Sequence, residues 1–312
     1  MHFTKTAESF GPYTKITLIE SASRTALSIV PELGARPVAL TVPFGAETWS
    51  VLESYADPAE FAHDDFAMGA FLAPFPNRVA DGRYTFQGET YQLAITRTDE
   101  HHAIHGLLRQ APFAITGAES TPEHYRLELE HKSEGAPGYP FPFTAHVTYR
   151  LSSNAVSVAT VLTNNADDPA PMGFGWHPYF TFGEPLATSH LMLPPLQQLP
   201  VDERLIPTGD PQPFSDFSSA APIGERRFDD GFRFTGDERA ITLTCPTHRR
   251  TLTVTCESAF DYLQLFTHPS ATALSIEPMT CAADAFNNGL GLRIVRPGQS
   301  LRAQYHVFAC VR

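Results

Sequence analysis

Hydrophobic and polar residues alternate with a period of two along much of this 312-residue chain, a pattern typical of strands that are buried on one face. Residues 14–20 and 26–30 alternate in this way, and Ser21–Arg24 between them predicts a turn. Residues 34–42 continue the pattern up to Pro43. The N-terminal part of the chain therefore predicts a β-meander.

The middle and C-terminal parts of the chain repeat the same alternation. The clearest hairpin is predicted at residues 143–151 and 155–163, with residues 152–154 as its loop. Further strands are predicted at 91–95, twice within 112–130, and at 240–244, 251–256, 261–266, 272–276 and 301–308. The sequence has no long run with a helical period and no repeat of fixed length. The pattern therefore predicts a mostly β chain and disfavours a propeller or a solenoid.

Several segments interrupt the alternation. Residues 56–68 are mixed and acidic and predict a loop, whereas residues 184–227, rich in Pro, Leu and Ser, predict a long excursion with short strands. The pair Asp81-Gly82 is a strong signal for a tight turn. Turns are also predicted at Phe228–Phe232 and Asp284–Gly289.

Composition excludes several classes of partner. The chain has 22 Lys and Arg against 34 Asp and Glu, a formal net charge of −12. A nucleic acid or an anionic membrane would require a basic surface, so neither is expected as a partner. Nothing resembles a linker, and β-rich folds often exceed 200 residues, so residues 1–312 are expected to form one domain.

The cysteines and the N-terminal residues indicate the cellular compartment in which the protein is expected. Cys245, Cys256, Cys281 and Cys310 form no CxxC pair and are interpreted as reduced thiols of a cytosolic protein. Neither a signal peptide nor a membrane-spanning run is recognisable, so a cytoplasmic location is expected.

Two titratable residues stand next to prolines in apolar surroundings. His177 precedes Pro178 and lies among aromatic residues, which places it in extended backbone where a ligand with a hydrophobic face, such as a sugar ring, can lie beside it. A histidine packed in an aromatic core is the alternative. Glu277 ends a predicted strand directly before Pro278, an unusual position for a merely solvated glutamate.

Three further segments carry polar side chains. Arg78, preceded by Asn77, follows two prolines that exclude a helix, so its guanidinium is expected to project from a rigid extended loop; a surface ion pair is the alternative. Phe228–Phe232 contains two adjacent acids, of which only one can face a site.

His101, His102 and His105 suggest a metal site, but no carboxylate or cysteine stands at ligand spacing, so no metal is expected.

Taken together, five segments resemble the aldose 1-epimerase (galactose mutarotase-like) family. They are Pro74–Arg78, His101–Gly106, Pro171–Phe180, Phe228–Phe232 and Ile276–Thr280, and the resemblance extends from about Gly34 to the C-terminus. It implies an all-β fold, a large antiparallel β-sandwich of the mutarotase supersandwich type. It also implies that Asn77, Arg78, His105 and Asp229 contact substrate, with Asp230 as the alternative to Asp229.

The activity implied by this resemblance is the interconversion of the α and β anomers of a free hexose. Ring opening needs a base for the proton of the C1 hydroxyl and an acid for the ring oxygen, and it needs no cofactor. Glu277 is the predicted base because carboxylates are usually ionised at neutral pH. His177 is the predicted acid, provided that acidic neighbours such as Asp229 raise its pKa.

Two alternatives stay open. A hexose-6-phosphate mutarotase would use additional arginines, for which Arg83, Arg97 and Arg109 are candidates. A sugar-binding protein of the same fold would lack catalysis, although the presence of both the acid and the base disfavours it. The chain also departs from the galactose-active members, which usually carry serine after the histidine that corresponds to His177, whereas this chain has Pro178.

Overall fold

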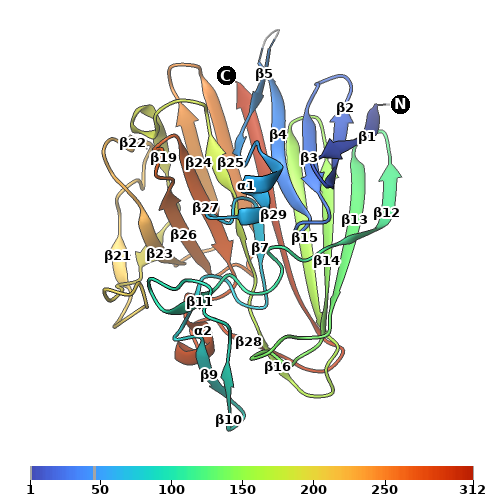
Figure 1. The fold of residues 1–312 in the computed structure, drawn as a ribbon. Helices are drawn as coiled ribbons and strands as arrows, with labels where there is room; N and C mark the ends of the chain where they lie inside the picture. The colour runs from blue at the N-terminus through green and yellow to red at the C-terminus, as the bar shows by residue number, and fades with distance from the viewer. Residues whose placement is uncertain (1, 45–46, 312) are drawn as a thin grey trace.

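Antiparallel sheets build nearly the whole molecule. The computed structural model describes residues 2–44 and 47–311, and every pair of named strands in this part of the chain is antiparallel (Figure 1). The N-terminal sheet contains, in spatial order, β1 (Phe3–Phe10), β2 (Tyr13–Glu20), β3 (Ala26–Val30), β4 (Arg36–Phe44) and β5 (Glu47–Ser50). The prediction of a meander over residues 14–42 is confirmed by β2, β3 and β4, whereas the two edge strands β1 and β5 were missed.

Two nine-stranded sheets form the sandwich. The β15 sheet has the order β12 (Ala114–Ser120), β13 (Tyr125–Ser133), β14 (Phe143–Leu151), β15 (Ala155–Asn164), β29 (Ser300–Val311), β25 (Arg250–Cys256), β24 (Ala240–Cys245), β19 (His190–Met192) and β22 (Ala221–Pro222). The β27 sheet has the order β21 (Gln212–Phe214), β20 (Leu196–Gln198), β23 (Asp229–Phe234), β26 (Tyr262–Thr267), β27 (Ala273–Met279), β17 (Gly175–His177) and β7 (Ala70–Leu72). It is completed by β18 (Tyr179–Thr181), which pairs with both β27 and β6 (Leu52–Glu53).

Short elements connect the sheets. They are the strand pairs β8 (Arg78–Ala80) with β11 (His102–Ile104), β9 (Arg83–Phe86) with β10 (Glu89–Gln92) and β16 (Ala170–Met172) with β28 (Arg293–Val295), the helices α1 (Pro58–His63) and α2 (Ala285–Asn288), and the 3-10 turn η1 (Leu186–Thr188). In the part of the chain that is described, no helix has the length and apolar character needed to span a membrane.

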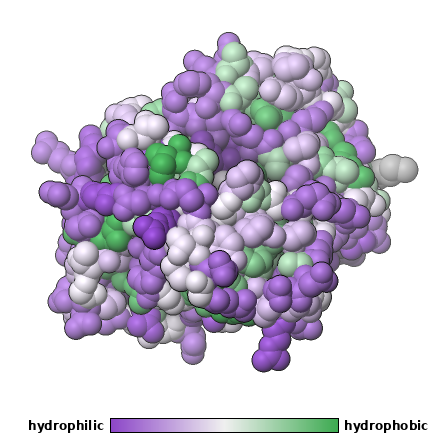
Figure 2. All heavy atoms as spheres, turned by 60° about the horizontal axis from the view of Figure 1, so that its bottom comes forward, coloured by the Kyte–Doolittle hydropathy of each residue, from purple (hydrophilic) through white to green (hydrophobic). Residues whose placement is uncertain are grey.

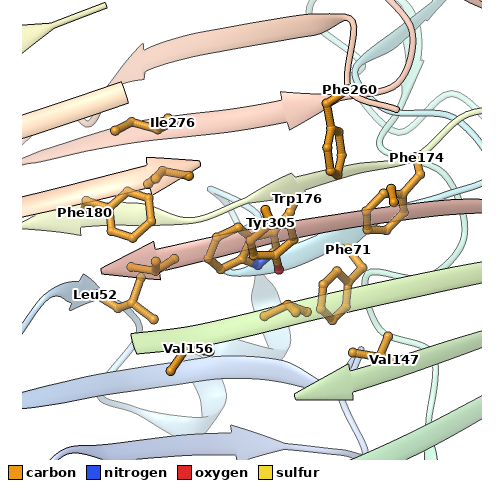
Figure 3. Close-up of a cluster of buried hydrophobic side chains, with 14 of the residues drawn as sticks. Leu52, Phe71, Val147, Val156, Phe174, Trp176, Phe180, Phe260, Ile276 and Tyr305 are labelled. Carbon is orange, nitrogen blue, oxygen red and sulfur yellow. The ribbon is translucent and has the colours of Figure 1, made fainter. Parts of the chain in front are cut away.

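The core lies between the sheets because the period-two pattern turns one face of each sheet inward, and the N-terminal sheet contributes Leu18, Leu27 and Leu40 to it. Trp176 of β17 stacks on Tyr305 of β29, with ring centroids 4.2 Å apart and planes 13° apart. Figure 3 shows these rings among other buried side chains from both sheets, including Phe71 and Phe180 of the β27 sheet and Val147 and Val156 of the β15 sheet. One cluster of buried hydrophobic residues extends in sequence from Phe3 to Ala309. On the face drawn in Figure 2, hydrophobic residues form only scattered patches among hydrophilic ones.

Most predicted strands are confirmed, but three predicted loops or turns are wrong. Residues 56–68 contain α1, because the Asp57 side chain accepts a hydrogen bond from the Ala59 amide and Pro58 fits the first helical turn. Phe228–Phe232 is not a turn, since β23 begins at Asp229 and pairs with β26. The segment Asp284–Gly289 contains the single-turn helix α2.

A buried ion network joins three distant segments beneath α1. The guanidinium of Arg36, at the start of β4, donates to both carboxylate oxygens of Asp64 at 2.6 Å, and both side chains are fully buried. Arg109 donates to the same carboxylate through Nε at 3.0 Å and Nη2 at 2.9 Å. Arg36 also donates to the Arg109 carbonyl oxygen, at 2.8 Å from Nε. The network therefore links β4, the end of α1 and the loop after β11.

Asp64→Asn should destabilise the protein by about 3–5 kcal/mol, because it leaves the buried Arg36 charge without its counter-charge. Asparagine keeps the shape of the side chain and tolerates the left-handed backbone of residue 64, whose φ is 63°. Urea unfolding measures the effect. Asp65→Asn is the matched control, since that carboxylate is 66% exposed and its loss should cost little. Equal stability of the two variants would contradict the prediction.

Candidate active site

A cavity of about 280 Å³ opens on the face of the β27 sheet that points away from the core. Its walls come from β17, β18, β23, β26 and β27, and from the segments that contain residues 63–67, 77–78 and 96–109. In Figure 1, α1 and β11 mark these covering segments. All six predicted site residues line the cavity: Asn77, Arg78, His105, His177, Asp229 and Glu277. The fold thus brings together positions that are up to 200 residues apart in the chain.

Strand alternation decides which side chains reach the cavity from the β27 sheet. Glu277 pairs with Gln264 across β26 and β27, and Asp229 pairs with Phe266 across β23 and β26. Residues directly opposite each other lie on the same face, so all four point into the cavity. Their neighbours along the strands, among them Leu263, Leu265 and Ile276, are buried in the core.

The same alternation separates the two adjacent acids of β23. Asp229 lines the cavity and accepts a hydrogen bond from Gln264 Nε2 at 2.9 Å. Asp230 instead accepts from Gln198 Nε2 at 2.6 Å and contacts Arg226 at 3.4 Å. The register therefore places Asp229, the residue preferred from the sequence, at the cavity wall.

His177 is held by contacts on several sides. It is the last residue of β17, and Pro178 separates it from β18. Its Nε2 lies 3.4 Å from Glu277 Oε1, and its Nδ1 lies 3.0 Å from Ser275 Oγ. The ring stacks on Tyr179 with centroids 5.1 Å apart and meets the edge of His105, also at 5.1 Å. These contacts leave the imidazole little freedom to rotate.

The two loops that carry Asn77 and His105 are joined through their backbones. The His105 amide donates to the Asn77 carbonyl at 2.9 Å, and the Leu107 amide donates to the Ala73 carbonyl at 2.6 Å. Gly106 permits this approach, because a Cβ there would lie 2.2 Å from the Ala73 carbonyl oxygen. The glycine that follows His105 in the sequence is thus needed for close contact between the loops.

Arg78 lies at the cavity wall with most of its donors already paired. It begins β8 rather than ending a loop, and its Nε and Nη2 donate to Glu100 at 2.6 and 3.1 Å. Its Nη1 donates to Asn77 Oδ1 at 3.0 Å. The guanidinium is held in one orientation, with donor capacity left on both Nη atoms.

The three histidines of the 101–105 segment do not converge. His105 lines the cavity, whereas His101 Nδ1 contacts Asp81 at 3.0 Å and His102 Nε2 contacts the Arg204 carbonyl at 3.2 Å. Among the described residues, no group of three or more His, Cys, Asp or Glu side chains is arranged to hold a metal ion.

Burial controls the protonation of the Glu277–His177 pair. It raises the pKa of Glu277 well above its usual range, with Asp229 adding to the effect and Ser275 opposing it. Burial, with Arg109 as the next cause, lowers the pKa of His177 to about 3. The expectation that acidic neighbours raise the pKa of His177 is therefore wrong, because loss of hydration outweighs them. Burial acts in the same way against the expected ionised form of Glu277. Burial thus favours the uncharged form of both groups, which is a protonated Glu277 beside a neutral His177.

Two further groups are affected by their surroundings. Burial lowers the pKa of His105 well below its usual value, and the His177 ring and nearby arginines lower it further. His105 is therefore neutral, and its buried Nδ1 has no hydrogen-bond partner in the protein. The pKa of Asp229 is raised, chiefly by loss of solvation at the cavity wall, while Arg78 opposes this shift.

The arginines considered for a phosphate lie in different places. Arg97 and Arg109 line the cavity, but Arg83 does not and instead lies on β9. Arg109 is paired with Asp64, and Arg97 lies 3.4 Å from Glu100 and 3.5 Å from Asp99. Each of these guanidinium groups in the cavity wall already has a carboxylate partner.

Sequence reasoning missed several lining or supporting residues. Gln264 is the single amide in the strand Tyr262–Thr267, and Ser275 stands two residues before Glu277. A period-two count from Glu277 places Ser275 on the same face of β27, so this signal was present in the sequence. Asp64 carried no such signal, because its site depends on how the loop after α1 folds over the sheet.

Comparisons with known proteins identify related sequences. The family model described as aldose 1-epimerase matches residues 15–307. The uncharacterized protein YihR of Escherichia coli K12 is 31% identical over 249 residues, which cover 77% of this chain and 79% of that protein. The aldose 1-epimerase of Escherichia coli K12 is 29% identical over 233 residues, which cover 71% of this chain and 64% of that enzyme.

Solved structures share the fold at low sequence identity. A galactose mutarotase-like protein from Clostridium acetobutylicum superposes with a TM-score of 0.88 at 16% identity, covering 99% of this chain and 98% of that chain. Galactose 1-epimerase from Lactobacillus acidophilus gives a TM-score of 0.83 at 17% identity, with coverage of 99% and 98%. These two likenesses concern the fold alone, whereas the family model matches the sequence itself over most of its length. The chain belongs to the aldose 1-epimerase family.

Proposed function

We propose that the protein is an aldose 1-epimerase that interconverts the α and β anomers of a free hexose. The observation that carries the proposal is the buried Glu277–His177 pair, with Oε1 and Nε2 3.4 Å apart at the wall of the cavity. Glu277 Oε2 is buried without a hydrogen-bond partner in the protein, so it is available to a substrate oxygen. Two proton-transfer groups within reach of one sugar ring are what anomer exchange requires.

One proton is enough to prepare both groups. The resting pair is neutral, with the proton on Glu277, and its transfer to His177 Nε2 gives a carboxylate and an imidazolium. In this form Glu277 takes the proton of the C1 hydroxyl while His177 protonates the ring oxygen, and the C1–O5 bond breaks. Rotation about C1–C2 presents the other face of the carbonyl group. The same two groups then act in reverse, and each proton returns to its starting atom.

The remaining residues of the site would bind hydroxyl groups. Arg78 can donate through its Nη atoms, and neutral His105 has an unpaired Nδ1. Asp229 can accept from a vicinal hydroxyl while it is held by Gln264. Tyr179 and Phe266 offer apolar surfaces to the sugar ring. We therefore assign substrate binding to Asn77, Arg78, His105 and Asp229, and proton transfer to Glu277 and His177.

Two other functions are distinguishable from this one. A hexose 6-phosphate is a candidate substrate because Arg97 and Arg109 line the cavity, but both are paired with carboxylates. Asp64, Asp65 and Asp229 further oppose a phosphate there. A sugar-binding protein without catalysis would not need both Glu277 and His177. It would broaden the NMR lines of a sugar without exchanging its anomers.

Glu277→Gln and His177→Asn should each reduce anomer exchange by at least about 10²-fold, because each removes one proton-transfer group. Proton NMR exchange spectroscopy on equilibrated glucose and galactose measures the rate at which the α and β anomers interconvert. Because the pKa of Glu277 is raised in the folded protein, its ionisation lowers the free energy of unfolding as the pH rises through this pKa. Glutamine cannot ionise, so Glu277→Gln should leave the midpoint of thermal unfolding unchanged or raise it. A Glu277→Gln protein that is well folded and retains near-full exchange would contradict the proposal.

The pH dependence should differ from that of an ordinary histidine. The pair keeps one proton from about pH 3, where His177 protonates, up to a pH well above 4.5, where Glu277 ionises. The value of kcat/KM should therefore stay level as the pH falls through 6.5, the ordinary pKa of histidine, and should decline only at lower pH. Exchange rates between pH 5 and 8, referenced to uncatalysed mutarotation, test this expectation. An acid-side decline centred near pH 6.5 would contradict it.

Glucose should be exchanged at least about tenfold faster than glucose 6-phosphate at equal concentration, a difference of about 1.4 kcal/mol. The reason is that each arginine of the cavity already contacts a carboxylate, and that Asp65 and Asp229 add negative charge to the cavity wall. Arg97→Gln serves as the control, since it should not selectively lower exchange of the phosphorylated sugar. If glucose 6-phosphate is exchanged faster than glucose and Arg97→Gln abolishes this advantage, the substrate is the phosphorylated hexose and the proposal of a free hexose is wrong.

A further inference from the structure

Ser275 is a fully buried polar residue in the middle of β27. Its neighbours Leu274 and Ile276 are fully buried hydrophobic residues, so Ser275 occupies the opposite face of the strand together with Glu277. It lies directly across from Tyr179 of β18, whose ring stacks on His177. A hydroxyl group at such a position needs a hydrogen-bond partner, and the structure provides one.

That partner is the His177 ring, at 3.0 Å between Ser275 Oγ and His177 Nδ1. Stacking on Tyr179 and the edge contact with His105 fix the plane of the ring, but neither contact determines which nitrogen carries a proton. The contact with Ser275 links the two assignments, because Nδ1 carries the proton when the hydroxyl group accepts the hydrogen bond. Ser275 also forms a hydrogen bond to Glu277 that lowers the pKa of this carboxyl group, so its own proton has an acceptor other than Nδ1. Nε2 then faces Glu277 Oε1 at 3.4 Å.

We propose that Ser275 is a positioning residue that accepts a hydrogen bond from His177 Nδ1–H and thereby makes Nε2 the nitrogen that gains and loses the proton. The inference rests on the proposed function. In the resting pair, the lone pair of Nε2 faces the acid proton of Glu277. Transfer of that proton gives an imidazolium whose Nδ1–H is still bonded to Ser275. When Nε2–H protonates the ring oxygen, His177 returns to its neutral Nδ1–H tautomer.

Without the Ser275 hydroxyl, two things change. The neutral ring can carry its proton on Nε2, so this nitrogen can no longer accept the proton of Glu277. The imidazolium also leaves Nδ1–H unpaired in a buried site, which disfavours the charged form. Both effects reduce the fraction of the pair that is ready to react. Neither effect concerns the residues that bind the hydroxyl groups of the sugar.

Ser275→Ala should lower kcat for anomer exchange about 10–100-fold, the usual loss when a group that orients a functional histidine is removed. KM should change by less than about twofold, because the residues that contact the sugar are untouched. Ser275→Thr keeps the hydroxyl and should recover most of the rate. Thr181→Val is the matched control, because it also removes a buried hydroxyl group. Thr181 lies on β18, next to β27, and its Oγ1 donates to the Thr272 carbonyl at 2.8 Å rather than to His177.

Long-range ¹H–¹⁵N correlation spectra of ¹⁵N-histidine-labelled protein test the tautomer directly, with His177→Asn to assign the signal. Wild-type protein should show the Nδ1–H tautomer for His177, and Ser275→Ala should shift the population towards Nε2–H. Wild-type His177 in the Nε2–H form, or a Ser275→Ala protein with unchanged tautomer and unchanged kcat, would overturn the inference. This readout needs no substrate. If the wild-type protein exchanges no sugar, the proposed function fails while the tautomer still decides the role of Ser275.

Discussion

Burial of a carboxylic acid beside an imidazole is the constraint on which the candidate site depends. Glu277 lies on a fully buried strand, 3.4 Å from His177 Nε2, and loss of hydration disfavours the charged form of each group. The two groups therefore share one proton as a neutral pair. An acid–base site usually needs groups with separate pKa values, whereas in the proposed mechanism one proton transfer within the pair produces both the acid and the base.

The Glu277–His177 pair can form because both faces of β27 are buried, one in the core and the other at the candidate site. One face of β27 packs Leu274 and Ile276 into the core, and the other presents Glu277 to the cavity and Ser275 to the His177 ring. Such a strand lacks the alternation of a half-exposed strand, since every residue from Ala273 to Met279 is buried. The rigid core beneath the site keeps the two proton-transfer groups at a fixed separation, as catalysis by positioned groups requires.

The segments that cover this face are held by ionic and backbone contacts in addition to the hydrophobic packing of residues such as Phe61. Asp64 joins Arg36 and Arg109 under the loop that follows α1, and backbone hydrogen bonds join the Asn77 and His105 loops. The fold alone leaves the substrate open, because related structures share it at 16–17% identity. The covering segments carry charged side chains at the cavity wall, where Arg78, Arg97 and Arg109 each contact a carboxylate.

The sequence by itself determined the β content, most strand positions and the residue types of the site. Period-two alternation reports burial of one face directly, so β2, β3, β14 and β15 were predicted nearly to the residue. The segment around His177 and the Glu277-Pro278 pair, read together with the family resemblance, identified the proton-transfer candidates. Tertiary structure alone decided the protonation of these groups, because a pKa depends on burial and on neighbours from other strands. It also decided that β23 is a strand that turns Asp229 towards the cavity, since the two adjacent acids look alike until the pairing register with β26 separates them.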